Sequence, residues 1–278
     1  MRKYAELTRT RVSAFASMTA LTGYVAGSGG LDSGALMAAL GVFLLASGAS
    51  ALNQVTEQDT DSLMRRTMLR PLPTGTIRRA KATTLSVLLV LSGLLVLGTA
   101  GPVPAALGLL ATLIYNGIYT PLKKRTGLAI LVGAIAGAMP PAIGWAMVGS
   151  GPVSPVLLAI CLLLYLWQMP HFWMILMRHR EDFMRAGLPT PGRHLSNAQI
   201  KRICLTWVAA TSAAGLMLPL LGSGTGSAAL ALMLAATALL LVTGLLAFSN
   251  PARREYFVNS NIYIILIMLS IVFGSVHP

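Results

Sequence analysis

The sequence predicts an all-α protein that crosses a membrane about nine times. Hydrophobic residues make up 55% of its 278 residues and charged residues only 10%, whereas soluble domains carry charge on about a quarter of their residues. Runs of about 20 apolar residues are long enough to cross a bilayer as helices. Nine such runs occur, at residues 12–29, 33–54, 82–100, 103–120, 128–149, 154–176, 202–222, 226–248 and 258–276.

Helix-breaking residues justify the limits of these runs. The first run follows a basic segment and precedes no convincing small-residue cleavage site, which favours a retained helix over a signal peptide. The fifth contains Pro140 and Pro141, which kink a helix and free carbonyl groups that a cavity or a neighbouring helix must satisfy. Glycine and proline mark the short connections on one side, at 27–30, 101–102, 149–152 and 222–226.

The positive charge predicts the orientation in the membrane. All 21 Lys and Arg residues lie before the first run or in alternate connections, while the opposite side carries Asp32 and no basic residue. The positive-inside rule therefore predicts a cytoplasmic N-terminus, cytoplasmic basic loops and an outside C-terminus. The same distribution indicates that the basic residues behind the net charge of +13 interact with anionic lipid headgroups and not with nucleic acid.

Only two of the basic connections are long, and each contains an acidic cluster. The motif loops cover residues 53–81, after the second run, and 177–201, after the sixth. The separation of four runs predicts two four-helix halves plus one further helix, as in membrane proteins built from repeats. We expect a single transmembrane domain over residues 1–278.

The first cluster has the spacing of an oxygen-ligand site. If the second helix continues past residue 54, Asn53, Glu57 and Asp61 recur every four residues and form one strip, whereas Asp59 points elsewhere. Such oxygen atoms suit Mg²⁺, which takes one or two carboxylates, keeps waters and shares phosphate oxygens. The alternative is that these acids cap a helix or neutralise neighbouring arginines.

Cations near this strip suit a phosphate-containing substrate. Arg66 and Arg70 lie four residues apart and carry planar forks that match phosphate oxygens. Lys123 and Lys124 add charge at the end of the fourth run. Acids beside these cations favour a diphosphate, although each cationic group alone could simply orient the chain.

The second cluster is Glu181 and Asp182, which follow an aromatic segment. Ionisable groups in membrane helices are energetically costly and usually functional, so His171 of that segment could ligate a metal or a porphyrin iron. The alternative is that it caps its helix. Four aromatic residues either belong to the interfacial aromatic belt or line a cavity, where an aromatic face could stabilise a carbocation: Trp173, Tyr119, Tyr115 and Trp145.

Together these segments resemble the UbiA-type intramembrane prenyltransferases and, within that family, the protoheme IX farnesyltransferase (haem O synthase) branch. The first signature is Asn53-x₃-Glu57-x-Asp59-x-Asp61-x₂-Met64-x-Arg66-Thr67-x₂-Arg70-Pro71-Leu72. The supporting segments are Leu7-Thr8-x₂-Arg11-Val12, Tyr119-Thr120-Pro121-Leu122-Lys123-Lys124-Arg125-Thr126, Gly137-Ala138-x-Pro140-Pro141-x₂-Gly144-Trp145, Pro170-His171-Phe172-Trp173 and Asp182-Phe183-x₂-Ala186-Gly187-x-Pro189.

The resemblance implies a UbiA-like bundle with a central cavity that opens near the cytoplasmic face, in the plasma (inner) membrane of a prokaryote. It implies Mg²⁺-dependent transfer of a farnesyl group from farnesyl diphosphate to a vinyl group of haem b (protohaem IX), which gives haem O. Haem A synthase or terminal-oxidase assembly factors become candidate partners.

The resemblance also implies roles for individual residues. Catalytic residues that also bind the metal are Asn53, Glu57, Asp61 and Asp182, with Glu181 as a further metal ligand. Residues that contact the diphosphate are Arg66, Arg70, Lys123 and Lys124. Residues near the acceptor are His171, Trp173 and Tyr119.

The sequence departs from the family pattern at a few positions. Glu57 stands where Asp is usual, Phe183 replaces the usual Tyr, Glu181 replaces a common Asp or Lys, and Arg9-Thr10 replaces Lys-Pro. One alternative is the same fold with a quinone-precursor or other aromatic or lipid acceptor. A second is a transporter for an anionic solute, which would place ionisable groups near the membrane midplane.

Overall fold

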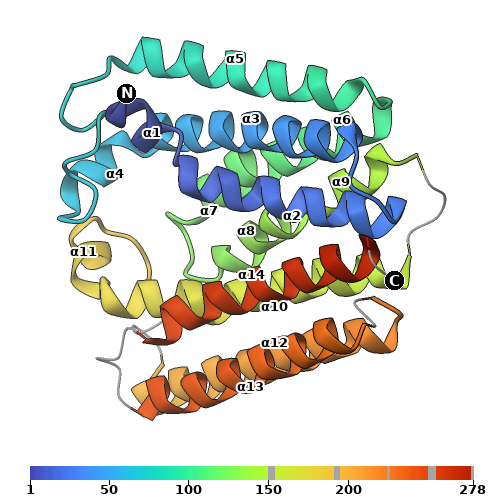
Figure 1. Cartoon of the computed structure of the whole chain (residues 1–278). Helices are drawn as coiled ribbons and strands as arrows, with labels where there is room; N and C mark the ends of the chain where they lie inside the picture. The colour runs from blue at the N-terminus through green and yellow to red at the C-terminus, as the bar shows by residue number, and fades with distance from the viewer. Residues whose placement is uncertain (150–153, 191–194, 224–225, 250–254, 277–278) are drawn as a thin grey trace.

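The computed structural model describes residues 1–149, 154–190, 195–223, 226–249 and 255–276, and within these ranges the chain is helical with no strand. The helices are α1 (Arg2–Leu7), α2 (Thr10–Ser28), α3 (Ser33–Thr56), α4 (Gln58–Leu63), α5 (Arg79–Gly98), α6 (Pro102–Thr112), η1 (Leu113–Tyr119), α7 (Thr120–Leu122), α8 (Ala129–Ala138), α9 (Pro140–Met147), α10 (Pro155–Arg178), α11 (Arg180–Arg185), α12 (Asn197–Leu220), α13 (Ser227–Ser249) and α14 (Glu255–Val276). Figure 1 shows the long helices running roughly side by side.

Eight helical segments in the described ranges are long and apolar enough to cross a membrane. They match the second to the ninth predicted runs, with α6 to α7 and α8 to α9 each forming one span. The first run corresponds to α2, which is not among the eight. A membrane crossing by α2 therefore stays a prediction. The buried hydroxyl groups of Ser13, Thr19 and Thr22 in this helix donate to carbonyl oxygens three to five residues earlier.

Glycines bring α2 against α9 at backbone contact. A Cβ added to Gly23 would lie 2.1 Å from the Pro141 carbonyl oxygen, and one added to Gly144 would lie 1.9 Å from the Ala20 carbonyl oxygen. Neither position has room for a side chain. Small residues allow helices in membrane proteins to approach this closely, where dispersion and hydrogen bonding hold them.

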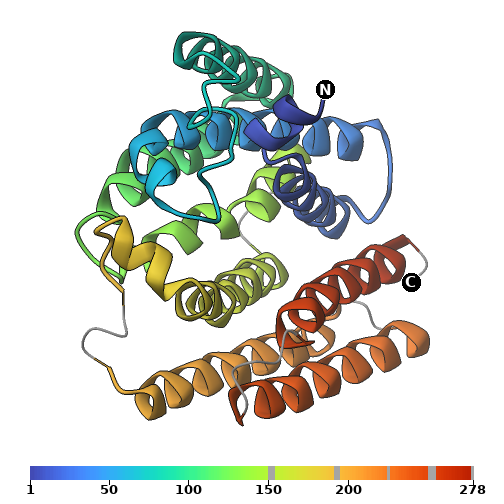
Figure 2. The same cartoon turned by 90° about the vertical axis from the view of Figure 1, so that its left-hand side faces the viewer.

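The helices form a ring, which Figure 2 shows end on. Helix α14 packs between α13 and α2, so the ninth predicted helix joins the last part of the chain to the first. Two buried hydrogen bonds join α14 to α10 and α12: Trp167 Nε1 donates to the Ser260 carbonyl oxygen (2.8 Å), and the Tyr263 hydroxyl donates to that of Thr211 (3.4 Å). The largest hydrophobic cluster lies among α8, α10, α12, α13 and α14.

The break predicted in the fifth run is confirmed, because α8 ends at Ala138 and α9 begins at Pro140. Gln168 of α10 packs into the space beside Gly137, where a Cβ would lie 2.1 Å from its Oε1. Its Nε2 donates to the Ala134 carbonyl oxygen at 3.3 Å. A polar side chain from a neighbouring helix thus supports the kinked span.

The fourth run contains a π-helical turn, η1, that its sequence pattern does not predict. Thr120, the next residue, directs both its backbone N–H and its hydroxyl to the Tyr115 carbonyl oxygen, the latter at 2.8 Å. Pro121 has no N–H, so the chain cannot form a regular turn here without losing a hydrogen bond. Wider turns of this kind often occur at functional sites.

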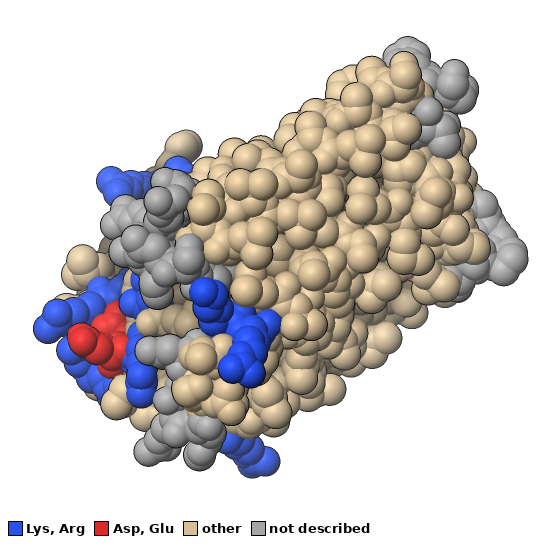
Figure 3. Space-filling view, turned by 90° about the horizontal axis from the view of Figure 1, so that it is seen from below, with Lys and Arg blue, Asp and Glu red and all other residues tan. Residues whose placement is uncertain are grey.

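Charged residues gather at one end of the molecule. Figure 1 places α1, α4 and α11 together at that end, and Figure 3 shows Lys and Arg there with a few acids while most of the visible surface carries no charge. Arg193, Arg253 and Arg254, which belong to the predicted basic loops, lie outside the described residues. The central cavity predicted for the bundle stays a prediction.

Candidate active site

The first acidic cluster lies where α3 passes into α4. Glu57 separates the two helices, but its N–H bonds to the Asn53 carbonyl oxygen (3.0 Å) and the Asp61 N–H bonds to that of Glu57 (2.8 Å). The helical spacing therefore continues across the junction. Asn53 and Asp61 are buried and Glu57 is partly buried, whereas Asp59 is exposed, as the predicted strip requires.

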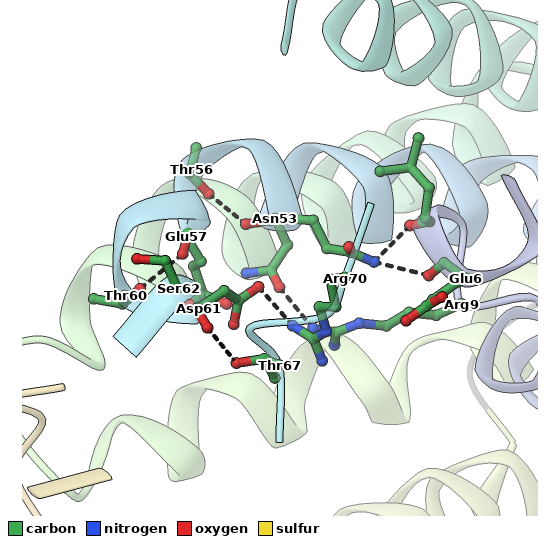
Figure 4. Close-up of polar contacts among 12 residues, drawn as sticks. Glu6, Arg9, Asn53, Thr56, Glu57, Thr60, Asp61, Ser62, Thr67 and Arg70 are labelled. Carbon is green, nitrogen blue, oxygen red and sulfur yellow. Dashed lines mark hydrogen bonds and ion pairs between the residues drawn. The ribbon is translucent and has the colours of Figure 1, made fainter. Parts of the chain in front are cut away.

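Both carboxylates of the strip are paired with cations from other segments. Arg70 Nη1 lies 2.7 Å from Asp61 Oδ2, and Asp61 retains only 2% of its exposure. Lys123, just after α7, pairs with Glu57. Figure 4 shows Arg70 reaching Asp61 from the loop that follows α4. Two of the predicted diphosphate-binding residues thus contact two of the predicted metal ligands.

The Asn53 side chain is held by two residues distant in sequence, Arg9 and Thr120. Its Oδ1 accepts from Arg9 Nη2 at 3.2 Å, and its Nδ2 donates to the Thr120 hydroxyl oxygen at 3.0 Å. Because the Thr120 hydroxyl donates its own proton to the Tyr115 carbonyl oxygen, it accepts from Asn53. The amide of Asn53 therefore has a single consistent orientation, with its oxygen toward Arg9.

Asp182 joins the second cluster to the first. Its Oδ1 accepts from the Arg65 backbone N–H (3.2 Å) and its Oδ2 from that of Arg66 (3.1 Å), while Arg185 lies 3.8 Å away. Burial by itself would raise the pKa of Asp182, but these donors and Arg185 hold it below its usual range. Glu181 is exposed, so only one acid of this pair faces the loop after α4.

The remaining predicted diphosphate-binding residues are more open to solvent. The Arg66 side chain is exposed, and its pKa is lowered by partial desolvation and by the charges of Arg70 and Arg9. Lys124 is also exposed. Neither side chain forms an ion pair with an acid of the described residues. Both can therefore bind a ligand without breaking an ion pair.

Tyr119 forms part of an aromatic wall beside the ion pairs. Lys123 Nζ lies 4.8 Å from the centre of its ring, and the ring centre of Tyr115 lies 5.6 Å away. Gly133 makes room for this ring, since a Cβ there would lie 2.7 Å from it. Tyr119, a predicted acceptor-binding residue, thus contacts Lys123 of the acid and base cluster.

The other two predicted acceptor-binding residues have different neighbours. The His171 ring packs against Trp167, with ring centres 5.1 Å apart, and Trp167 packs against Phe15 of α2 at 5.4 Å. Trp173 lines an apolar pocket of about 270 Å³ between α8, α10 and α12, together with Trp207. The structure thus does not unite the three aromatic residues in one surface.

The donor atoms fit a metal that arrives with a phosphate ligand. Within the described residues, no three His, Cys, Asp or Glu side chains gather closely enough to hold an ion alone. Asp61 and Glu57 each use one oxygen for a cation, which leaves the second oxygen of each carboxylate for a metal. Mg²⁺ commonly takes one or two carboxylates and completes its shell with water and phosphate.

The sequence reasoning gave no role in this site to Arg9 or Thr120, and it named Tyr115 only as an aromatic residue that belongs to the interfacial belt or lines a cavity. Arg9 was visible only as one of several N-terminal basic residues and as a departure from a family motif. Tyr115 and Thr120 carry no charge and lie within an apolar run. The turn at η1, which brings them to Asn53, has no clear signature in sequence.

Comparison with known proteins gives consistent findings. The model of the UbiA prenyltransferase family matches residues 16–269. A protoheme IX farnesyltransferase of Geobacter sulfurreducens is 42% identical over 219 residues, which cover 78% of this chain and 80% of that protein. One of Oleidesulfovibrio alaskensis is 33% identical over 271 residues, which cover 97% and 95%.

Solved structures share the fold. A UbiA homologue from Archaeoglobus fulgidus bound to GPP and Mg²⁺ superposes with a TM-score of 0.72 at 16% identity, covering 99% of this chain and all of that one. The apo structure of a homologue from Aeropyrum pernix gives a TM-score of 0.77 at 18% identity, with 96% and 97% coverage.

Proposed function

The chain belongs to the UbiA prenyltransferase family, and from this premise we propose that it transfers a farnesyl group from farnesyl diphosphate to a vinyl group of haem b. The product would be haem O. The relatives named protoheme IX farnesyltransferase support this acceptor, because they resemble the chain over most of its length.

The observation that carries the proposal is the pairing of acids and cations at one end of the bundle. Asp61 is held by Arg70 and Glu57 by Lys123, and the second acidic cluster reaches the same loop through Asp182. A diphosphate offers the cations better partners, since phosphate oxygens accept two parallel bonds from arginine. Carboxylate oxygens would then be free for the metal.

Mg²⁺ held by Asn53, Glu57, Asp61 and Asp182 would supply positive charge to the departing diphosphate. Asn53 Oδ1 already accepts from Arg9, and each Asp182 oxygen accepts one backbone N–H. The metal would therefore use the second lone pair of an oxygen that also accepts a hydrogen bond. Glu181 is exposed and would join only if its side chain turned inward.

The protein's own cations would stabilise the leaving group. The bond between the first farnesyl carbon and the bridging oxygen breaks, and its electron pair leaves with the diphosphate. Arg66, Arg70 and Lys123 would bind the oxygens that gain this charge, with Lys124 at the rim. Fixed charges aimed at the position where charge develops commonly give the largest catalytic contribution.

The allylic cation that remains would react with the electron-rich vinyl group. The vinyl carbon forms the new bond, the adjacent carbon becomes electron-deficient, and a water oxygen adds there and releases a proton. The faces of Tyr115 and Tyr119 line the site beside Lys123 and would stabilise the cation before it reacts. His171 and Trp173 are proposed acceptor contacts on α10.

We place the charged end of the bundle in the cytoplasm of a prokaryotic cell, facing the inner leaflet of its plasma membrane. The gathering of basic side chains there (Figure 3) supports this orientation. An anionic-solute transporter is less well supported, because the acids and bases of the site lie at that end and not at mid-depth. Haem A synthase or a terminal-oxidase assembly factor would be the partner that takes up the haem product.

The acceptor can be tested by competition. Purified protein in lipid discs would be incubated with farnesyl diphosphate, Mg²⁺ and an equimolar mixture of haem b and an aromatic quinone precursor, and products would be identified by mass spectrometry. We expect only the haem to gain a farnesyl group and one water. Prenylation of the aromatic acid alone would contradict the proposed acceptor while leaving the prenyltransferase chemistry intact.

A further inference from the structure

We propose that Arg9 is a diphosphate-binding residue, which the N-terminal segment delivers to the site. The inference deepens the proposed function and depends on it. Arg9 lies between α1 and α2, outside both acidic motifs. Figure 4 shows its side chain reaching from that segment toward Asn53, on the side of the site where Arg70 meets Asp61.

The backbone of Arg9 is held in a costly conformation. Its φ of 47° and ψ of 49° are left-handed, and within the described ranges no other residue except glycine has a positive φ. A left-handed backbone is energetically unfavourable for a residue that has a Cβ, and residues strained in this way cluster at functional sites. Here the geometry turns the arginine into the bundle just before α2 begins.

The guanidinium group is incompletely used. Nη2 donates to Asn53 Oδ1 (3.2 Å) and Nη1 to the Tyr115 hydroxyl (3.4 Å), both of them uncharged partners. Its Nε–H is buried and has no hydrogen-bond partner within the described residues. A buried donor without an acceptor is rare and costly, so this edge of the fork points to a missing anionic ligand.

The charge of Arg9 is also without a direct counter-ion. No carboxylate in the described part of the chain lies within ion-pair distance of the Arg9 guanidinium group. The acids of the first cluster, Asp61 and Glu57, are paired with Arg70 and Lys123 instead. The guanidinium group of arginine stays protonated in proteins. The group therefore remains charged in a setting where unpaired charge is unfavourable.

The charges that meet in this region leave room for an anion. The cations are Arg9, Arg66, Arg70, Lys123 and Arg185, and the acids are Glu57, Asp61 and Asp182. Five positive groups against three negative ones leave two positive charges in excess. A metal would increase that excess, and an incoming diphosphate would neutralise it while giving the Arg9 Nε–H an acceptor.

The inference is tested by binding and not by turnover. Calorimetry would measure the affinity of the purified full-length protein for inorganic pyrophosphate with Mg²⁺. The variants are Arg9→Met, which removes the charge, and Arg9→Lys, which keeps it without the planar fork. Arg11→Met is the matched control, because Arg11 lies two residues away and is exposed.

We expect Arg9→Met to weaken pyrophosphate binding by about tenfold or more, as expected for a lost bond to a charged group. Arg9→Lys should fall between this variant and the wild type, and Arg11→Met should bind as the wild type does. Equal binding by Arg9→Met and the wild type would overturn the inference. Absence of binding by the wild type itself would instead contradict the proposed function.

Two further variants separate ligand contact from a structural role. Arg9→Gly removes the side chain and suits the left-handed backbone, so it should fold at least as well as Arg9→Met and still bind weakly. In an Asn53→Ala background, Arg9→Met should weaken binding further. If it has no additional effect there, Arg9 acts only through Asn53, and the claim that it contacts the anion is wrong.

Discussion

Arg70 and Asp61 face each other inside the bundle, with Nη1 of the arginine 2.7 Å from Oδ2 of the buried carboxylate. The pair links the predicted diphosphate site to the predicted metal site in one contact. Removing either partner would leave an uncompensated charge in a poorly solvated place. Without ligands, the charges of Arg70 and Asp61 therefore neutralise each other. Bound Mg²⁺ and diphosphate would replace this one ion pair with two, Asp61 with the metal and Arg70 with the diphosphate.

The first prediction concerns metal removal. Because Asp61 and Glu57 have cationic partners in the protein itself, folding should not depend on a bound ion. We expect a chelator to abolish turnover and leave the melting temperature of the detergent-solubilised protein unchanged, with activity restored by excess Mg²⁺. A large fall in the melting temperature on chelation would mean that the metal is structural.

The second prediction compares two adjacent arginines. Both arginines donate a backbone N–H to Asp182. The Arg66 side chain also interacts electrostatically with Arg70, Arg9 and Asp61 of the site. We expect Arg66→Met to raise the KM for farnesyl diphosphate about tenfold or more. Arg65→Met keeps the backbone contact and should change the KM little. Equal effects in steady-state kinetics would show that only total charge matters here.

The third prediction concerns the contact between α2 and α9. A Cβ at Gly144 would lie 1.9 Å from the Ala20 carbonyl oxygen, so the helices must separate in Gly144→Ala. Overpacking of this kind costs about 1–3 kcal/mol or more. Gly98→Ala is the control, because no heavy atom of the described residues lies within 4 Å of that position. Thermal melts should show a loss only for Gly144→Ala.

The fourth prediction uses the lowered pKa of Asp182. Its ordinary value is 3.8, and the backbone donors of Arg65 and Arg66 hold it lower in the folded state. The unfolded chain then binds more protons, so the carboxylate stabilises the fold above pH 3.8 and this contribution disappears as the pH falls through the folded value.

Asp182→Asn should accordingly be less stable than the wild type at neutral pH, and the gap should narrow as the sample is acidified. Melting temperatures measured over a pH series test this. A gap that is constant from neutral to acidic pH would contradict the ionic origin of the effect.

Local patterns in the sequence were sufficient for much of the fold. The helical spacing of Asn53, Glu57 and Asp61 predicted a shared face and an outward Asp59, and both follow from one helix and its continuation. Prolines predicted the break between α8 and α9 because proline acts on its own turn. Such features depend on neighbours in sequence.

Contacts between distant segments were beyond the same reasoning. Nothing near Arg9 indicates that it bonds to Asn53, 44 residues away, and nothing near Asp182 indicates that its carboxylate accepts the N–H groups of residues 65 and 66. The π-helical turn at η1 was missed because apolar periodicity does not distinguish it from an α-helix. These are the features that assemble the site.

The most direct test of the central claim is to measure haem O and released pyrophosphate together for the wild type and for Asp61→Asn. Asparagine keeps an acceptor oxygen for Arg70 but removes the negative charge. We expect equal amounts of both products from the wild type, and a rate about a hundredfold or more lower from a variant that remains folded. Undiminished formation of both products by Asp61→Asn would contradict the account of the site.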